Sequence, residues 1–103
     1  MTITLKEIYD EFLELEMVSN QADFSEFLGK KPSWYSSTVS HSRGITLDSL
    51  CRISWRLKNI YLATLEAIIE AEEEDVEAFE NGLESLQDLI GRVQQEIDGR
   101  MPS

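Results

Sequence analysis

The chain is poor in the residues that most often build reactive centres, with one cysteine and one histidine in 103 residues. A single thiol, Cys51, excludes an internal disulfide bond, and no partner residue supports a redox or catalytic role for it. Cys51 lies between Leu50 and Ile53 in an apolar stretch, so we predict a small buried side chain. No other ligand is spaced to join His41 in a metal site. We therefore expect no metal and no cofactor.

Long apolar runs are also missing. No stretch approaches the roughly 18 apolar residues that cross a membrane, and the start of the sequence, MTITLKEIYDEF, is too acidic for a signal peptide. We expect a cytoplasmic protein without membrane contact. The sequence contains no Ser-His-Asp set, no glycine-rich phosphate loop and no Cys/His motif. These absences predict that the protein is not an enzyme.

Basic residues are few, and their distribution is uneven. Nine Lys and Arg stand against twenty Asp and Glu, which gives a net charge of −11. Residues 29–60 nevertheless hold six Lys or Arg and one acid, for a local charge of +5, whereas 1–28 carry −6 and 61–103 carry −10. The overall charge argues against a protein that simply coats nucleic acid. The basic segment is typical of a DNA-facing surface, although the same six charges could lie on scattered faces.

A first helix is predicted from a strong start signal. Thr4 and Glu7 form a capping box, and Ile3 and Ile8 occupy the positions of a hydrophobic staple. Apolar residues then recur with helical period, and we predict that the helix ends near Val18. The acidic residues on its other side form a solvated face rather than a catalytic cluster.

Three short helices joined by turns are predicted between Ser19 and Leu57. The first begins after Ser19 or Asn20 and ends at Gly29, the second spans residues 33–40, and the third opens at Thr46 after a loop from His41 to Ile45. We expect this last helix to end near Asn59. Trp34 and Tyr35 are adjacent and cannot face the same way, so one should pack into the core and the other should stay partly exposed.

This layout resembles the lambda-repressor-like (Cro-like) helix-turn-helix family over about forty residues. The resemblance rests on Gln21, Ser25, Gly29, the run Pro32-Ser33-Trp34-Tyr35-Ser36, Arg43-Gly44, and Thr46-Leu47-Asp48-Ser49-Leu50 continuing to Ile53. It implies a four-helix domain whose middle helix enters the DNA major groove. It also implies a phosphate contact by Gln21. The residues predicted to contact double-stranded DNA are Gln21, Lys30, Lys31, Ser33, Ser36, Ser37, Ser40 and Arg43.

A heptad pattern follows the basic segment. Apolar residues recur at alternating spacings of three and four from Leu62 onward, and Glu72 is the only break. The segment forms either one long helix or an antiparallel hairpin that turns at Asn81-Gly82. In both cases we predict homodimer packing along the seam, through Leu62, Leu65, Ile69, Val76, Phe79, Leu83, Leu86, Ile90, Val93 and Ile97.

The sequence therefore predicts an all-α protein with three parts. These are a helix-turn-helix domain (1–59), an acidic heptad segment for dimerisation (60–98) and a disordered tail (99–103). Two functions remain open. The first is a small dimeric DNA-binding regulator of transcription. The alternative is a protein-interaction regulator on the same scaffold, such as an antiactivator, an antitoxin-like protein or a phage-encoded inhibitor, whose acidic surfaces bind a protein partner.

Overall fold

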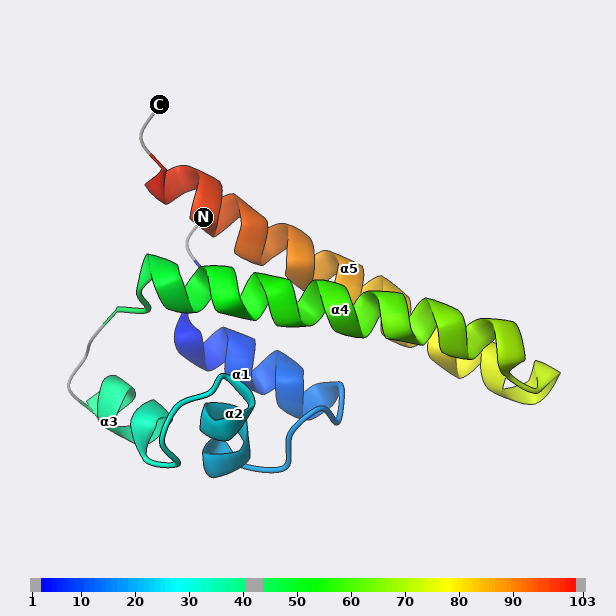
Figure 1. Cartoon of the computed structure of the whole chain (residues 1–103), viewed down its shortest axis with the longest axis horizontal. Coiled ribbons are helices and arrows are strands. Elements are labelled where there is room, and N and C mark those ends of the chain that lie inside the picture. The colour runs from blue at the N-terminus through cyan, green and yellow to red at the C-terminus, as the bar shows by residue number, and fades with distance from the viewer. Residues whose placement is uncertain (1–2, 41–43, 102–103) are drawn as a thin grey trace.

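The computed structural model describes residues 3–40 and 44–101 of the protein. This part of the chain is all helical, as the sequence predicts (Figure 1). The helices are α1 (Leu5–Glu14), α2 (Gln21–Phe27), α3 (Trp34–Ser40), α4 (Leu47–Glu70) and α5 (Glu73–Arg100). None of these five has the length and apolar composition that a membrane span requires.

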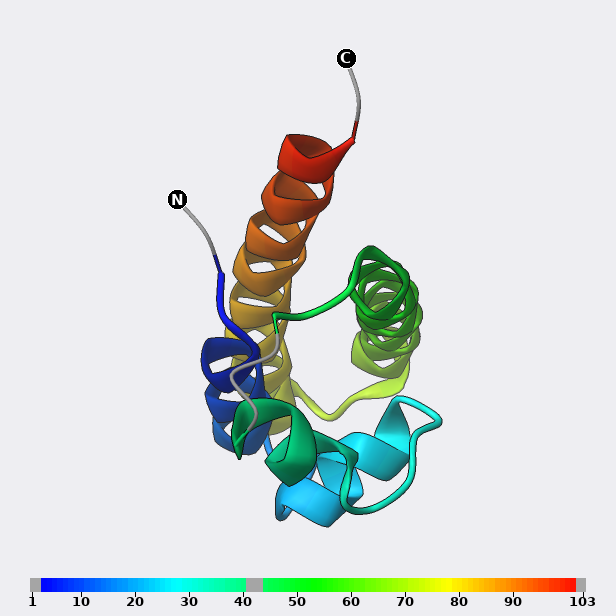
Figure 2. The same ribbon diagram turned by 90° about the vertical axis from the view of Figure 1, so that its left-hand side faces the viewer.

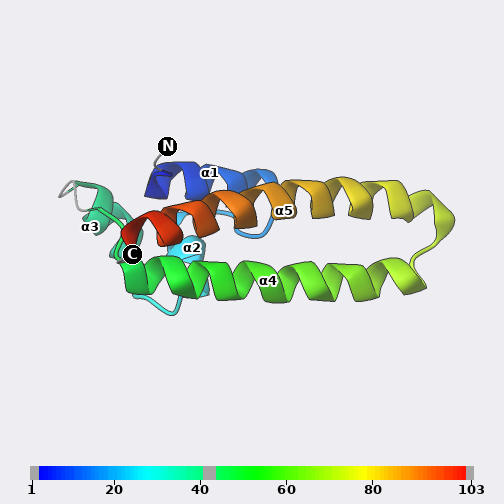
Figure 3. The same ribbon diagram turned by 90° about the horizontal axis from the view of Figure 1, so that it is seen from above.

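The two long helices α4 and α5 run antiparallel and form one layer of the molecule (Figure 3). α1 lies alongside α5, and the short helices α2 and α3 cover one end of the assembly. Seen end-on, α4 and α5 stand on opposite sides, with α1, α2 and α3 closing the space beneath them (Figure 2). A single elongated body of 46 × 34 × 20 Å results.

One hydrophobic core joins all five helices. Its aromatic centre is Phe12 of α1, Phe24 of α2 and Tyr35 of α3, where the ring centroids of Phe12 and Phe24 are 5.0 Å apart. The helical pair supplies the rest, with Leu50, Ile53 and Leu57 from α4 and Leu86, Leu89, Val93 and Ile97 from α5. The apolar periodicity of each helix therefore points to one shared interior.

Helix starts follow the capping chemistry of the sequence. Thr4, Asn20 and Thr46 each accept a hydrogen bond from the backbone N–H three residues on. Such caps satisfy N–H groups that have no partner inside the helix. One half of the predicted capping box forms, since Thr4 accepts from the Glu7 N–H; the Glu7 carboxylate accepts from the Thr4 hydroxyl at 3.2 Å instead of from the Thr4 backbone. Ile3 and Ile8 of the predicted staple are both buried.

α1 is shorter than predicted, ending at Glu14 rather than near Val18. Glu16 adopts a left-handed backbone conformation with φ of 59°. The Met17 N–H then bonds the Phe12 carbonyl at 3.0 Å, which closes the helix in a Schellman arrangement. The chain turns here so that Val18 can enter the core from the loop.

The prediction that the fourth helix ends near Asn59 is wrong, because α4 continues to Glu70. The boundary predicted at residue 59 thus falls inside a helix. The predicted turn at Asn81-Gly82 is also misplaced: both residues lie within α5, and the hairpin turns at Ala71 and Glu72, which have extended backbone angles. The predicted tail from residue 99 begins too early, since the helix reaches Arg100.

The residues of the predicted heptad seam differ in their exposure to solvent and do not form one continuous exposed face. Its members Leu86, Val93 and Ile97 are buried in the core of their own chain, so the prediction that they form a dimer interface is wrong in this fold. They lie in the hydrophobic cluster that α5 shares with α1 and α4, which the sequence pattern did not anticipate. Four further members are partly covered, namely Val76, Phe79, Leu83 and Ile90. Only Leu62, Leu65 and Ile69 remain exposed.

Two arginines of α5 form ion pairs and hydrogen bonds with α1 and with the segment before α4. The Arg92 guanidinium lies 2.7 Å from the Glu7 carboxylate and 3.6 Å from that of Glu11. Arg100 pairs with Glu96 and donates a hydrogen bond to the carbonyl of Ile45, just before α4. These contacts fix α5 against α1 and against the entry to α4.

Candidate nucleic-acid interface

The middle helix, α3, separates its two aromatic residues as predicted. Tyr35 is buried, with its ring 4.7 Å from that of Tyr9 and 5.6 Å from that of Phe24. Burial, with the Asp10 carboxylate nearby, raises the pKa of Tyr35. Trp34 is half-exposed on the other side. The burial of Tyr35 fixes which face of α3 is left to solvent.

A buried serine anchors the start of α3. The Ser25 hydroxyl accepts a hydrogen bond from the Tyr35 backbone N–H at 3.0 Å and donates one to the Gln21 carbonyl at 3.0 Å. Ser25 is fully buried in α2. The first turn of a helix has N–H groups without intrahelical partners, and here a neighbouring helix supplies the acceptor. α2 and α3 are thereby held in a fixed relative orientation.

The turn between α2 and α3 presents two lysines. α2 ends in a second Schellman arrangement, with Gly29 at φ of +74° and the Lys30 N–H bonded to the Ser25 carbonyl at 2.9 Å. The Lys30 ammonium then lies over the Trp34 ring, 5.9 Å from its centroid. Lys31 is exposed beside it.

Two arginines of α4 reach the same turn. A guanidinium nitrogen of Arg52 lies so close to Gly29 that a Cβ there would meet it at 3.1 Å. Arg56 lies over the Phe27 ring at the end of α2, 5.4 Å from the centroid. Together with Lys30 and Lys31, these residues form what we term the turn cations. The alternative that the basic residues lie on scattered faces therefore does not hold for these four.

The turn cations differ from three other basic residues of the chain. Lys6, Arg92 and Arg100 each lie within 4.0 Å of a carboxylate. Across residues 3–40 and 44–101, none of the turn cations has such a carboxylate partner. Their charge is consequently available to an external anion, whereas the charge of the other three is neutralised within the fold.

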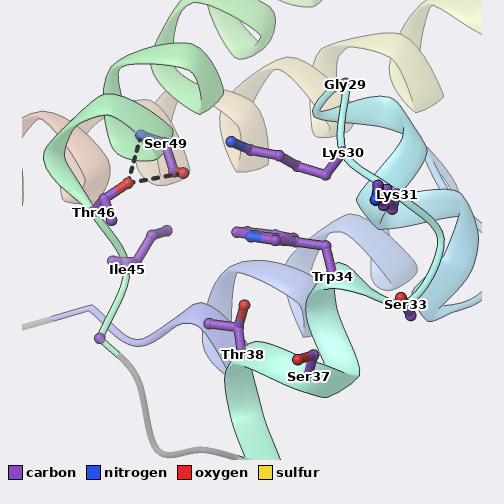
Figure 4. Close-up of a pocket in the computed structure, with 11 residues that line it drawn as sticks. Gly29, Lys30, Lys31, Ser33, Trp34, Ser37, Thr38, Ile45, Thr46 and Ser49 are labelled. Carbon is purple, nitrogen blue, oxygen red and sulfur yellow. Dashed lines mark hydrogen bonds between the residues drawn. The ribbon is translucent and has the colours of Figure 1, made fainter.

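A pocket of about 530 Å³ opens beside Lys30 and Lys31, between the turn, α3 and the start of α4. Figure 4 shows Lys30 stacked over Trp34 on one side, with Ile45, Thr46 and Ser49 facing them across the opening. The Thr46 hydroxyl contacts that of Ser49 at 3.0 Å. The lining thus combines ammonium groups, hydroxyls and one indole face.

Half of the predicted DNA-contacting residues line this pocket, namely Lys30, Lys31, Ser33 and Ser37. Gln21, Ser36 and Ser40 are exposed but do not line it. The hydroxyls of Ser36 and Ser40 donate to the carbonyls of Ser33 and Ser37, which leaves their oxygens as acceptors. Arg43 and His41 lie outside the described residues.

The sequence did not single out Arg52, Arg56, Trp34 or the Thr46–Ser49 edge as part of the site. The local charge of +5 was the available signal for the arginines, but their approach to Gly29 and Phe27 depends on tertiary packing. Cys51 is exposed, so the prediction of a buried thiol is wrong. The inward stripe of α4 passes through Leu50, Ile53 and Ser54, which leaves residue 51 on the outer side.

No three His, Cys, Asp or Glu side chains come together to hold a metal ion in the part of the chain that the structure describes. The arrangement instead suits a polyanion, because several cations and hydroxyls share one open surface.

The sequence pattern of one protein family, described as a family of unknown function (DUF6626), matches residues 5–100. The match covers all five helices. No curated protein and no solved structure matches the chain.

Proposed function

We propose that this chain, which belongs to the family of unknown function DUF6626, is a small regulator of transcription that binds double-stranded DNA. The observation that carries the proposal is that four cations without carboxylate partners lie on or against the end of α2 and the turn that leads to α3. In helix-turn-helix proteins the start of this helix meets the base edges while the flanking groups meet phosphates. The resemblance to the lambda-repressor-like family supports the same orientation.

The chemistry of the surface predicts how DNA is held. Phosphates attract lysine and arginine, and hydroxyls and backbone N–H groups supplement them. The outer face of α3 offers serines rather than the Arg, Asn or Gln side chains that read bases in bidentate fashion. Affinity then comes mainly from phosphate contacts, and discrimination between sequences is weak.

The acidic remainder of the molecule restricts the mode of binding. The far ends of α4 and α5 carry an exposed acidic run between Glu70 and Glu80. Like charges repel, so DNA approaches only the end that bears α2 and α3. The net charge of −11 is compatible with DNA binding under this arrangement, because the charges are segregated.

The test is binding to a random-sequence duplex library, measured by fluorescence anisotropy from about 50 to 200 mM salt, followed by sequencing of the retained DNA. We expect affinity to fall steeply with salt, as counterion release requires. Absence of any retained DNA at the lowest salt would overturn the proposal.

A matched pair of variants locates the contact. Lys31→Gln removes one turn cation, whereas Lys6→Gln removes the same charge from α1, where Lys6 pairs with Asp10 at 2.8 Å. We expect Lys31→Gln to reduce the slope of log affinity against log salt by about one. Lys6→Gln should leave that slope unchanged. Equal effects of the two changes would mean that net charge alone, and not this surface, governs binding.

A specific observation also favours the second candidate, a protein-interaction regulator. The turn of the α4–α5 hairpin and the first turn of α5 expose Glu72, Glu73, Glu74 and Asp75 in succession. Such a surface suits a basic protein partner. Charge reversal at Glu73 and Glu74 should abolish capture of that partner from a lysate and leave DNA binding intact.

A further inference from the structure

The outward face of α4 carries a second apolar stripe. Trp55, Leu62 and Ile69 are 62%, 57% and 83% exposed, and Leu65 between them is 38% exposed. Soluble proteins seldom leave a row of large apolar side chains in water unless another surface covers it. The inward face of the same helix already packs on the core through Leu57, so the exposed stripe is not needed for folding.

The stripe has the spacing of a helix–helix seam. Read along the chain, its positions are 51, 55, 58, 62, 65 and 69, which alternate in steps of four and three. This alternation is the pattern that lets two helices pack side by side over several turns. Figure 2 shows α4 at the edge of the molecule, with α5 and α1 on its other side, so a second helix can approach.

Charge along α4 indicates which helix fits. The exposed residues Arg52 and Arg56 flank the first half of the stripe, which itself includes Lys58, and Glu66 and Glu70 flank the second half. A second copy of α4 in the antiparallel direction places each basic half against an acidic half. A parallel copy would place like charges against each other, which is unfavourable.

We propose that two copies of this chain associate through the outward faces of α4, antiparallel, about a two-fold axis near Leu62. Each copy presents the same patch, as a two-fold interface requires. Leu62 of one copy then lies against Leu62 of the other, and Trp55 lies near Ile69. This interface differs from the one predicted along the whole heptad segment, because only Leu62, Leu65 and Ile69 of the predicted seam remain exposed.

The spacing of the two DNA-facing ends follows from this geometry, and this step alone rests on the proposed function. Residue 49 lies 13 positions before Leu62, or about 20 Å at 1.5 Å per residue. The two copies of Ser49, which lines the pocket beside α3, would then stand roughly 40 Å apart along the helix direction, close to the ~35 Å between successive major grooves on one face of DNA. Enriched DNA sites should accordingly be two-fold symmetric with half-sites about one turn apart.

The association itself is tested without DNA, by light scattering after size-exclusion chromatography. We expect a dimer for the native chain and a monomer of unchanged helix content, by circular dichroism, for Leu62→Glu. The control is Val39→Glu, which places the same charge at an exposed apolar residue of α3 and should remain dimeric. A native chain that is monomeric at all concentrations overturns the proposal, whatever its DNA binding. A Leu62→Glu variant that remains dimeric does the same.

The relative direction of the two α4 helices is tested by disulfide formation under mild oxidation. In an antiparallel pair the two Cys51 residues lie about 33 Å apart, since each is 11 positions from the axis at 1.5 Å per residue, far beyond the reach of a disulfide. We expect no Cys51 cross-link in the native dimer. A variant carrying Cys51→Ser and Leu62→Cys should cross-link readily. Rapid Cys51 cross-linking of the native dimer would instead require a parallel arrangement and overturn the antiparallel one.

Discussion

At the scale of single residues, Ser25 shows how one hydroxyl can set the position of a helix. Its oxygen is the acceptor for a buried backbone N–H of the next helix, so its role is not exchangeable with that of an alanine of similar size. The cost of leaving a buried donor unpaired exceeds the benefit of making an ordinary hydrogen bond. The orientation of α3, and with it the exposure of the Ser33–Ser37 face, depends on this contact.

Replacement of Ser25 by alanine should lower the free energy of unfolding by about 1–3 kcal/mol, because the Tyr35 N–H loses its acceptor. Ser36→Ala is the matched control, since the Ser36 hydroxyl donates only to an exposed carbonyl in its own turn. That change should stay within about 0.5 kcal/mol of the native value. Urea unfolding of the three proteins measures both effects. Equal stabilities of the two variants would contradict the role assigned to Ser25.

At the scale of helices and turns, two glycines have opposite roles. Gly29 ends α2 with a positive φ and is tightly approached by Arg52. Gly82 lies in the middle of α5 with no atom within 4 Å of where a Cβ would stand. Glycine is needed in the first position, where L side chains are strained, and weakens the helix in the second. The same residue type therefore marks a turn in one place and not in the other.

Alanine substitution at the two glycines should change the free energy of unfolding in opposite directions. Gly29→Ala should destabilise the protein by about 1–2 kcal/mol, the cost of a left-handed conformation for an L-residue. Gly82→Ala should stabilise it by about 0.5–1 kcal/mol, because it improves a helix interior. Thermal unfolding followed by circular dichroism measures both changes. A destabilising Gly82→Ala would mean that residue 82 forms the turn that its neighbour Asn81 suggests.

The sequence predicted helix starts better than helix ends. The caps at Thr4, Asn20 and Thr46 are local chemistry, and the structure contains all three. The predicted hairpin turn at Asn81-Gly82 follows the breaker residues, whereas the observed turn at Ala71 and Glu72 follows the charge. The acids from Glu73 to Asp75 lie in the first turn of α5, where the helix dipole favours them. Within one continuous helix Glu73 and Glu74 would lie three and four residues from Glu70, where like charges repel.

At the scale of the whole molecule, the core crosses the boundary predicted at residue 59. Leu89 of α5 is fully buried in the same cluster as Phe12 and Phe24. Short amphipathic helices are rarely stable by themselves and depend on tertiary packing. We infer that residues before and after position 59 unfold together.

A Leu89→Ala substitution tests this cooperativity and should lower the free energy of unfolding by about 2–5 kcal/mol. The experiment uses a Trp55→Phe background, so that Trp34 fluorescence reports on α3 alone while circular dichroism reports on all helices. Both signals should shift to lower urea by the same amount. If the Trp34 transition stayed in place while the helix signal moved, residues 1–59 would be an independent domain.

The candidate site could be predicted only in part, because half of its cations come from a helix that is distant in the sequence. Lys30 and Lys31 were accessible to sequence reasoning because they occupy a turn recognisable from Gly29 and Pro32. Arg52 and Arg56 belong to another helix, and nothing local indicates that they reach this turn. Their placement follows from how α4 packs on α2, which the three-dimensional fold alone determines.

The ion pair between Arg92 and Glu7 joins residues separated by 85 positions. Contacts between distant parts of a chain slow folding, because a long loop must close before they form. During synthesis, the aromatic centre around Phe12 would remain without its α5 cover until about residue 97 had been added. Until α5 packs, the apolar side chains around Phe12 therefore stay in contact with water.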